Sequence, residues 1–193
     1  MKDFILCKPG ALPKSECENL INNFETKWVG RQEEGLIGPG VLDTTMKQAT
    51  EVFFYLGQEF SPFELDYLKY SIEDYIKEFP FLDDLPSWGI YNVFKMQKYK
   101  PGEGFFSLHC ENHPTPIKTS FEKRLIAWMI YLNDVRDGGY TEFPTQDKKF
   151  QPRCGDILMW PAYWTHPHRG IVSRTETKYI LTGWYNFYNL NNK

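Results

Sequence analysis

Two segments in the first 80 residues repeat apolar residues at helical spacing. In the first, Ser15 and Glu18 form a capping box, and one face carries Cys17, Leu20, Ile21, Phe24 and Trp28. In the second, Ser61 precedes a proline at the first helical position and Pro80 marks the end, with a stripe of Leu65, Leu68, Ile72, Ile76 and Phe79. The pattern predicts two helices that pack on a sheet.

From about Trp88 the pattern changes to that of β-strands. Five runs are predicted as strands: Ile90 to Tyr99, Phe105 to Glu111, Leu125 to Leu132, Ile157 to Trp160 and Tyr179 to Phe187. The middle run is almost wholly apolar, as expected for a strand covered on both faces. These strands and the turns between them predict a mainly β fold, a jelly roll with the helices packed outside.

The chain length suits one domain. We expect residues 1–193 to form it, with a helical part at 1–87 and a β core at 88–188. Residues 46–56 fit a helix or a strand equally well. Residues 31–43 are rich in glycine and charge and are predicted to be a long loop that shapes substrate access. The polar tail at 189–193 is expected to fray.

Composition narrows the classes of function. The net charge is −3 and no basic run is present, which argues against nucleic acid or an anionic membrane as partner. Four cysteines lack Cys-x-x-Cys spacing, so neither a zinc knuckle nor a disulfide framework is indicated. The N-terminal apolar run is short for a signal peptide and no segment is long enough to span a membrane. We therefore expect a soluble, cytoplasmic protein.

The candidate chemistry is a metal site. On a strand, residues i and i+2 share a face, so His109 and Glu111 can offer an imidazole and a carboxylate to one ion. A remote histidine would complete the face, and both His166 and His168 are available, on one face of an extended segment. Two histidines and one carboxylate form the facial arrangement of non-haem Fe(II) oxygenases. Lys178, ten residues after His168, is a cation that can anchor an acidic co-substrate.

Residues 96–185 resemble the prolyl 4-hydroxylase branch of the 2-oxoglutarate/Fe(II)-dependent dioxygenases. Any one matching motif is weak evidence for this resemblance, but six motifs in the family's order are strong evidence. They are Tyr99-Lys100-Pro101-Gly102, His109-Cys110-Glu111, Ile130 to Asp134, Gly138 to Pro144, Gly155 to Pro161 and Pro167-His168-Arg169-Gly170, followed by Lys178 through Trp184. The resemblance implies a double-stranded β-helix of the cupin-like jelly-roll type.

The resemblance also implies roles for individual residues. The iron ligands would be His109, Glu111 and His168, and His168 is preferred to His166 because Lys178 then falls at the family's usual interval. Most members carry Asp where this chain has Glu111, which still supplies a hard oxygen ligand. The co-substrate would be held by Lys178, Tyr99 and Tyr131, with Thr182 beside them. His166 and His113 are interpreted as rim or solvated histidines, and Cys110 as a buried filler.

The implied reaction is hydroxylation of a C–H bond, with release of succinate and CO2. It would use Fe(II), 2-oxoglutarate and O2, with ascorbate as a further reductant to test. The resemblance favours a peptidyl proline as substrate, and a free amino acid or other small molecule is the nearest alternative. A jelly-roll protein that binds a metal or a small acid without turnover is the alternative from another class. Residues 31–43 and 112–120 are predicted to close over the site. The oligomeric state is not indicated.

Overall fold

The computed structural model describes residues 2–38, 40–56, 62–112 and 123–188. Three sheets and two α-helices make up this part of the chain. The helices are α1 (Lys14–Thr26) and α2 (Pro62–Glu78). Short 3-10 helices cover Val29–Arg31, Pro80–Asp84 and Pro144–Gln146.

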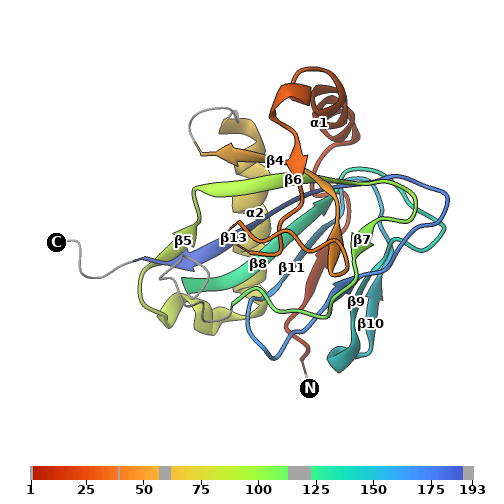
Figure 1. The fold of residues 1–193 in the computed structure, drawn as a ribbon. Helices are drawn as coiled ribbons and strands as arrows, with labels where there is room; N and C mark the ends of the chain where they lie inside the picture. The colour runs from red at the N-terminus through yellow and green to blue at the C-terminus, as the bar shows by residue number, and fades with distance from the viewer. Residues whose placement is uncertain (1, 39, 57–61, 113–122, 189–193) are drawn as a thin grey trace.

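The main sheet has eight strands, drawn from both halves of the chain (Figure 1). Its order is β1 (Leu6–Lys8), β11 (Ile157–Pro161), β8 (Arg124–Tyr131), β13 (Lys178–Phe187), β6 (Val93–Tyr99), β4 (Thr50–Tyr55) and β2 (Glu33–Glu34), and β5 (Trp88–Ile90) pairs with β13. Its pairings are antiparallel. Residues 46–56, which fitted either element, therefore form strands. β1 and β4 also bring the first 87 residues into the main sheet, and the boundary at residue 87 stays a prediction.

Two smaller sheets complete the β structure. One has the order β10 (Lys148–Phe150), β9 (Thr141–Phe143) and β12 (Arg169–Gly170), and the other pairs β3 (Lys47–Gln48) with β7 (Gly104–Phe105). Phe143 of β9 and Leu68 of α2 belong to two different apolar clusters of the core. The predicted jelly-roll class, mainly β with helices outside, is confirmed.

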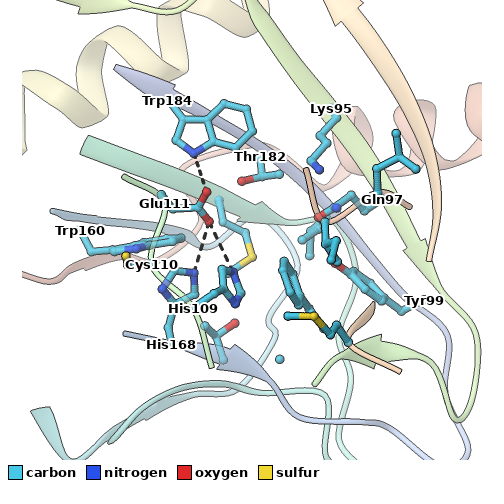
Figure 2. Close-up of a pocket in the computed structure, with 18 of the residues that line it drawn as sticks. Lys95, Gln97, Tyr99, His109, Cys110, Glu111, Trp160, His168, Thr182 and Trp184 are labelled. Atoms are coloured by element: carbon cyan, nitrogen blue, oxygen red, sulfur yellow. Dashed lines mark hydrogen bonds and ion pairs between the residues drawn. The ribbon is translucent and has the colours of Figure 1, made fainter. Parts of the chain in front are cut away.

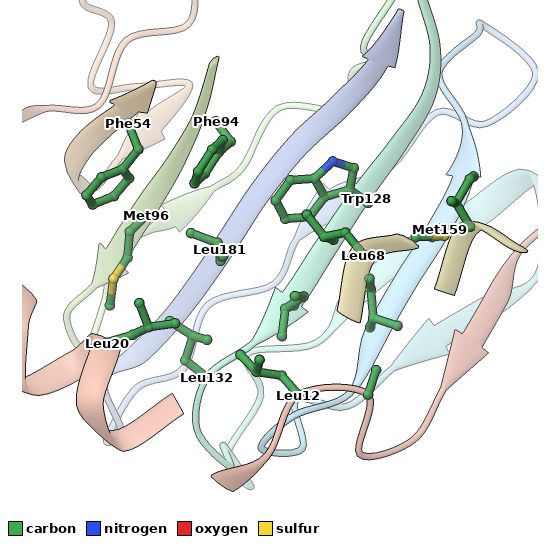
Figure 3. Close-up of a cluster of buried hydrophobic side chains, with 14 of the residues drawn as sticks. Leu12, Leu20, Phe54, Leu68, Phe94, Met96, Trp128, Leu132, Met159 and Leu181 are labelled. Atoms are coloured by element: carbon green, nitrogen blue, oxygen red, sulfur yellow. The ribbon is translucent and has the colours of Figure 1, made fainter. Parts of the chain in front are cut away.

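The two faces of the main sheet carry two separate apolar clusters. Alternate residues of β8 divide between them because successive strand side chains point to opposite faces. Ile126, Trp128 and Ile130 belong to the cluster shared with the helices, whereas Ala127, Met129 and Tyr131 belong to the other. Figure 3 shows Leu20 of α1 and Leu68 of α2 packed with Trp128, Met96 and Leu181. The helices therefore seal one face and leave the other for the site.

The helix faces agree with the predicted stripes, but the first helix start does not. Cys17, Leu20 and Phe24 are buried on α1 as expected. However, α1 begins at Lys14 after Pro13, without a side-chain cap, so the predicted capping box at Ser15 is wrong. Proline at the N-terminal side already supplies helical φ and needs no hydrogen-bonded cap. α2 begins at Pro62 as predicted, while Ser61 and the Leu65 side chain lie outside the described residues.

Candidate metal centre and its cavity

His109 and Glu111 do not lie on a regular strand, which corrects the strand predicted over residues 105–111. β7 ends at Phe105, and beyond it His109 forms an isolated antiparallel bridge with His168. His109 N–H donates to His168 O at 3.0 Å, and His168 N–H donates to His109 O at 2.8 Å. Glu111 N–H donates to Ala162 O at 3.0 Å. These backbone bonds bring together ligand-type residues that are far apart in sequence.

The three predicted ligand side chains converge on one point (Figure 2). Nε2 of His109 lies 3.7 Å and Nε2 of His168 lies 3.4 Å from Oε1 of Glu111. One ligand atom from each residue lies within 4.8 Å of the others, and in the described part of the chain they form the candidate metal group. Two imidazoles and a carboxylate are the donor set of a facial iron site.

Hydrogen bonds orient both imidazoles for ligation. Nδ1 of His109 faces Ser107 O at 2.8 Å, and Nδ1 of His168 faces His166 O at 3.1 Å. A carbonyl accepts a hydrogen bond from Nδ1–H, so each Nε2 keeps its lone pair for the shared point. Phe105 stacks on the His109 ring at 3.7 Å between centroids. The arrangement fits a divalent ion.

The surroundings of Glu111 and His109 favour the protonation states that bind a metal ion, an ionised carboxylate and a neutral imidazole. Burial alone would raise the pKa of Glu111, but His109, His168 and Arg124 hold it well below the usual value. Burial, and then the neighbouring His168, lower the pKa of His109. A carboxylate anion beside a neutral imidazole is the pairing that a metal ion needs.

The second oxygen of Glu111 is held by two residues whose contacts were not predicted. Trp184 Nε1–H donates to Oε2 at 2.9 Å and Arg124 Nη1 donates to it at 3.1 Å. The guanidinium carbon of Arg124 lies 3.5 Å from the centroid of the Trp184 ring. An arginine at the start of the otherwise apolar strand β8 was the sequence signal for this contact, since buried arginine is rare without a partner.

His166 has both ring nitrogens engaged elsewhere. Nε2 donates to Asp3 O at 2.8 Å, and Nδ1 lies 2.9 Å from Thr165 Oγ1. The structure thus gathers His168, not His166, with His109 and Glu111. His113 and residues 113–120 of the predicted closing segment lie outside the described residues.

The metal group lines a cavity of about 360 Å³, within the range of small-molecule sites. β13 contributes alternate residues to its wall, namely Lys178, Ile180, Thr182 and Trp184. β6 contributes Lys95, Gln97 and Tyr99 (Figure 2). Leu36, Ile37 and Gly38 of the predicted substrate loop also line it.

Lys178 is buried in this wall, with 5% of its surface exposed. Its ammonium donates to Gly139 O at 2.9 Å and lies 4.9 Å from the centre of the Tyr99 ring. Burial lowers its pKa to about 8. No described carboxylate forms an ion pair with it, so this end of the cavity presents a buried cation to an acidic ligand.

The other predicted co-substrate residues lie close by but differ in exposure to the cavity. Tyr99 lines it, and its hydroxyl donates to Gln97 Oε1 at 3.0 Å. Thr182 lines it as well, while its hydroxyl donates to Trp128 O at 2.8 Å. Tyr131 lies behind the wall, with its hydroxyl 2.7 Å from Thr141 Oγ1 and 3.1 Å from Phe150 O. Thr141, not Tyr131, faces the cavity.

The model of the 2OG-Fe(II) oxygenase superfamily matches residues 94–186. This segment, just under half of the chain, is therefore similar to that superfamily. The resemblance inferred from the motifs is confirmed, because the matched segment contains the whole metal group and Lys178.

A protein of Acanthamoeba polyphaga mimivirus, named provisionally as a prolyl 4-hydroxylase, is 31% identical over 71 residues. The match covers 33% of this chain and 29% of that protein, so it spans less than a third of the relative.

Solved structures of prolyl hydroxylases share the fold over nearly the whole chain. The viral collagen prolyl hydroxylase from Paramecium Bursaria Chlorella virus-1, in a 2OG complex, has a TM-score of 0.70 at 17% identity and covers 96% of this chain and 97% of its own. The Trichoplax adhaerens prolyl hydroxylase, bound to a peptide fragment of the oxygen degradation domain of hypoxia inducible factor, has a TM-score of 0.73 at 18% identity, with coverages of 96% and 84%. A Pseudomonas putida prolyl-4-hydroxylase has a TM-score of 0.70 at 14% identity. The match covers 96% of this chain and 93% of that protein.

No helix in the described residues combines the length and apolar character needed to cross a bilayer.

Proposed function

We propose that this protein is a 2-oxoglutarate- and Fe(II)-dependent dioxygenase that hydroxylates a C–H bond, with release of succinate and CO2. One observation carries the proposal: two imidazole Nε2 atoms and a carboxylate oxygen meet in a cavity that also holds a buried lysine without a carboxylate partner among the described residues. A metal site explains the first feature and an acidic co-substrate explains the second.

His109, Glu111 and His168 would hold Fe(II) on one face. Three protein ligands leave positions for a co-substrate and for O2, as in other sites of this donor set. Bound iron, with 2-oxoglutarate and O2, supplies the oxidising chemistry. The protein supplies the ligands, their orientation and a shielded cavity.

Lys178 would bind the distal carboxylate of 2-oxoglutarate. Its ammonium is buried, and a buried charge is stabilised by pairing with an opposite charge. Thr141 lies in the same wall and is positioned by the Tyr131 hydroxyl, so it would serve as a further hydrogen-bond partner. Tyr99 would pack against the ligand and keep Lys178 in place through its ring.

A peptidyl proline is the first substrate to test. The names of the similar proteins support it, since they include collagen prolyl hydroxylase and a prolyl hydroxylase bound to a peptide. A free amino acid or another small molecule is the alternative. We also propose a cytoplasmic location, because Cys7, Cys17, Cys110 and Cys154 are all free thiols.

The test is succinate formation from 2-oxoglutarate with Fe(II), O2 and ascorbate, with and without proline peptides. Wild type should release succinate, whereas His109→Ala, Glu111→Ala and His168→Ala should each lose at least 100-fold, since two ligands hold the ion poorly. His166→Ala is the matched control and should keep most of the activity, because both its nitrogens face away from the metal group.

Absence of succinate from wild type, with or without peptides, would favour a binding protein without turnover. An inactive His166→Ala beside an active His168→Ala would contradict the ligand assignment. Mass spectrometry of a cell extract treated with the enzyme, searched for the addition of one oxygen atom, would identify the substrate.

A further inference from the structure

The cavity has a second cationic end, away from Lys178. Lys95 lies on β6 opposite Thr182 of β13, whereas Tyr99 lies opposite Lys178. The two positions are four residues apart along β6, which corresponds to about 13 Å along the sheet. Figure 2 shows Lys95 and Thr182 on the side of the cavity that carries Trp184. Lys95 therefore marks a separate part of the pocket.

Lys95 belongs to a buried cluster with more positive than negative charge. Both oxygens of Glu51 lie 3.2 Å from Lys95 Nζ, and the same carboxylate pairs with Lys47. In the described part of the chain, these two ammonium groups have ion pairs with Glu51 alone. The side chains of Lys47 and Glu51 are fully buried, while Lys95 is 13% exposed.

Two cations on one carboxylate are unbalanced in a place that water barely reaches. Burial, and then the neighbouring Lys95, lower the pKa of Lys47 to about 7, so the cluster carries both positive charges only below about pH 7. In that range the excess buried charge is unfavourable unless an opposite charge arrives. Lys95 is the member of the cluster that lines the cavity, so a ligand would reach the excess charge there.

The same cluster holds the roof of the cavity at this end. Lys47 Nζ donates to Leu36 O at 3.1 Å, and Leu36 lies in the loop segment that lines the pocket. Gln97 donates to Glu51 and accepts from the Tyr99 hydroxyl, which fixes the wall between the two cationic ends. The Lys95 end of the cavity is thus bordered by residues that are hydrogen-bonded to one another.

We propose that Lys95 binds a carboxylate of the substrate, so that the enzyme acts on acid-bearing molecules. The carboxylate would come from a free amino acid or from an acidic side chain next to the reacting residue of a peptide. This inference rests on the proposed dioxygenase function, since it assigns the second cation after Lys178 has taken the co-substrate.

The experiment compares matched acid and amide probes on protein loaded with Mn(II) and a non-reactive 2-oxoglutarate mimic. The probes are L-proline against L-prolinamide, and capped Pro-Glu against capped Pro-Gln peptides, titrated by calorimetry. Wild type should bind the acid of at least one pair 10-fold or more tightly than its amide. The pair in which the acid binds more tightly than the amide tells whether the substrate carboxylate comes from a free amino acid or from a peptide side chain.

Three variants locate the effect. Lys95→Met should reduce the acid preference to less than 2-fold, and it leaves Glu51 paired with Lys47. Lys95→Arg keeps the charge and should retain most of the preference. Lys98→Met is the matched control on the same strand: Lys98 points to the other face and pairs with Glu25 at 2.8 Å, so its loss should change nothing.

Three outcomes would overturn the inference. In the first, wild type binds acid and amide equally, or binds neither measurably. In the second, the preference for the acid persists in Lys95→Met. In the third, Lys95→Met loses affinity for the mimic. The last would place Lys95 in the co-substrate site. Failure of the mimic to bind wild type would instead be a failure of the proposed function, so the two are distinguishable.

Discussion

At the scale of single residues, Glu111 has two tasks. Its Oε1 faces the two histidine nitrogens, and its Oε2 accepts hydrogen bonds from Trp184 and Arg124. A carboxylate that bridges in this way needs the reach of glutamate. The usual aspartate of the family is one methylene shorter, about 1.5 Å of chain.

We therefore expect Glu111→Asp to bind Mn(II) at least 10-fold more weakly, although aspartate is an equally good oxygen ligand. The shorter side chain cannot keep both sets of contacts. Calorimetric titration of Mn(II) measures the change. Trp184→Phe is the control: it removes one donor but keeps the glutamate, and should have the smaller effect. Wild-type affinity in Glu111→Asp would show that the bridge is not needed.

Lys178 predicts a pH dependence of co-substrate binding. Burial lowers its pKa to about 8, and a bound carboxylate would raise the pKa again. The affinity for the mimic should be constant below about pH 8 and fall up to tenfold per unit above it, because the free protein then loses the cation. Titration of the Mn(II)-loaded protein from pH 6.5 to 9.5 measures this.

The fall should be absent from two variants. Lys178→Met should bind the mimic about 100-fold or more weakly at every pH, as for the loss of a buried pair worth 3–5 kcal/mol. Lys178→Arg stays charged and should bind at an intermediate level with a flat profile, since its planar fork presents a different geometry. A flat profile in wild type would mean that another group anchors the acid.

At the scale of elements, the helices and the site occupy opposite faces of the main sheet. Leu20 on α1 is 3% exposed and packs in the helix-side cluster, whereas the cavity is lined from the other face. A substitution on the helix side of the sheet should therefore lower the stability of the protein without changing its metal affinity.

Leu20→Ala should lower the free energy of unfolding by about 2–5 kcal/mol through loss of contacts and a residual cavity. Its Mn(II) affinity below the unfolding transition should match wild type. Ser15→Ala is the control on the same helix: Ser15 is exposed and caps nothing, so the change should stay within about 0.5 kcal/mol. Urea unfolding measures the change in the free energy of unfolding for both variants. A decrease of about 1 kcal/mol in the free energy of unfolding of Ser15→Ala would show that Ser15 does cap the helix.

At the scale of the whole molecule, the cavity is walled by the main sheet and by both small sheets. Lys178 comes from β13, Thr141 from β9 and Phe105 from β7, and Leu36 comes from the N-terminal half. A ligand that bridges these parts binds only the folded protein, and so stabilises all of them together.

Mn(II) alone should raise the melting temperature, and the 2-oxoglutarate mimic should raise it further. At 100 times its Kd the mimic adds about 2.7 kcal/mol, or roughly 5–10 °C for a chain of this size. Scanning calorimetry measures the shift. In Lys178→Met the metal increment should remain and the mimic increment should vanish. No mimic increment in wild type would count against co-substrate binding.

Much of this arrangement was predictable from local patterns. Period 3.6 identified both helices, and the almost wholly apolar run at 125–132 identified the central strand, whose described residues are all buried. Histidines and a carboxylate at family spacing pointed to the metal group. These signals are readable because burial repeats with the period of the element, and because ligation requires particular side chains.

Contacts between distant segments were decided by the tertiary structure. His109 and Glu111 are placed by pairing with His168 and Ala162 and not by a strand of their own. The short strands β1, β9, β10 and β12 are too brief to show a period. Likewise, Lys47, Glu51 and Lys95 look like ordinary surface charges in sequence. Only the packing of β3, β4 and β6 buries them together, because charge balance in a cavity depends on neighbours that the local sequence does not contain.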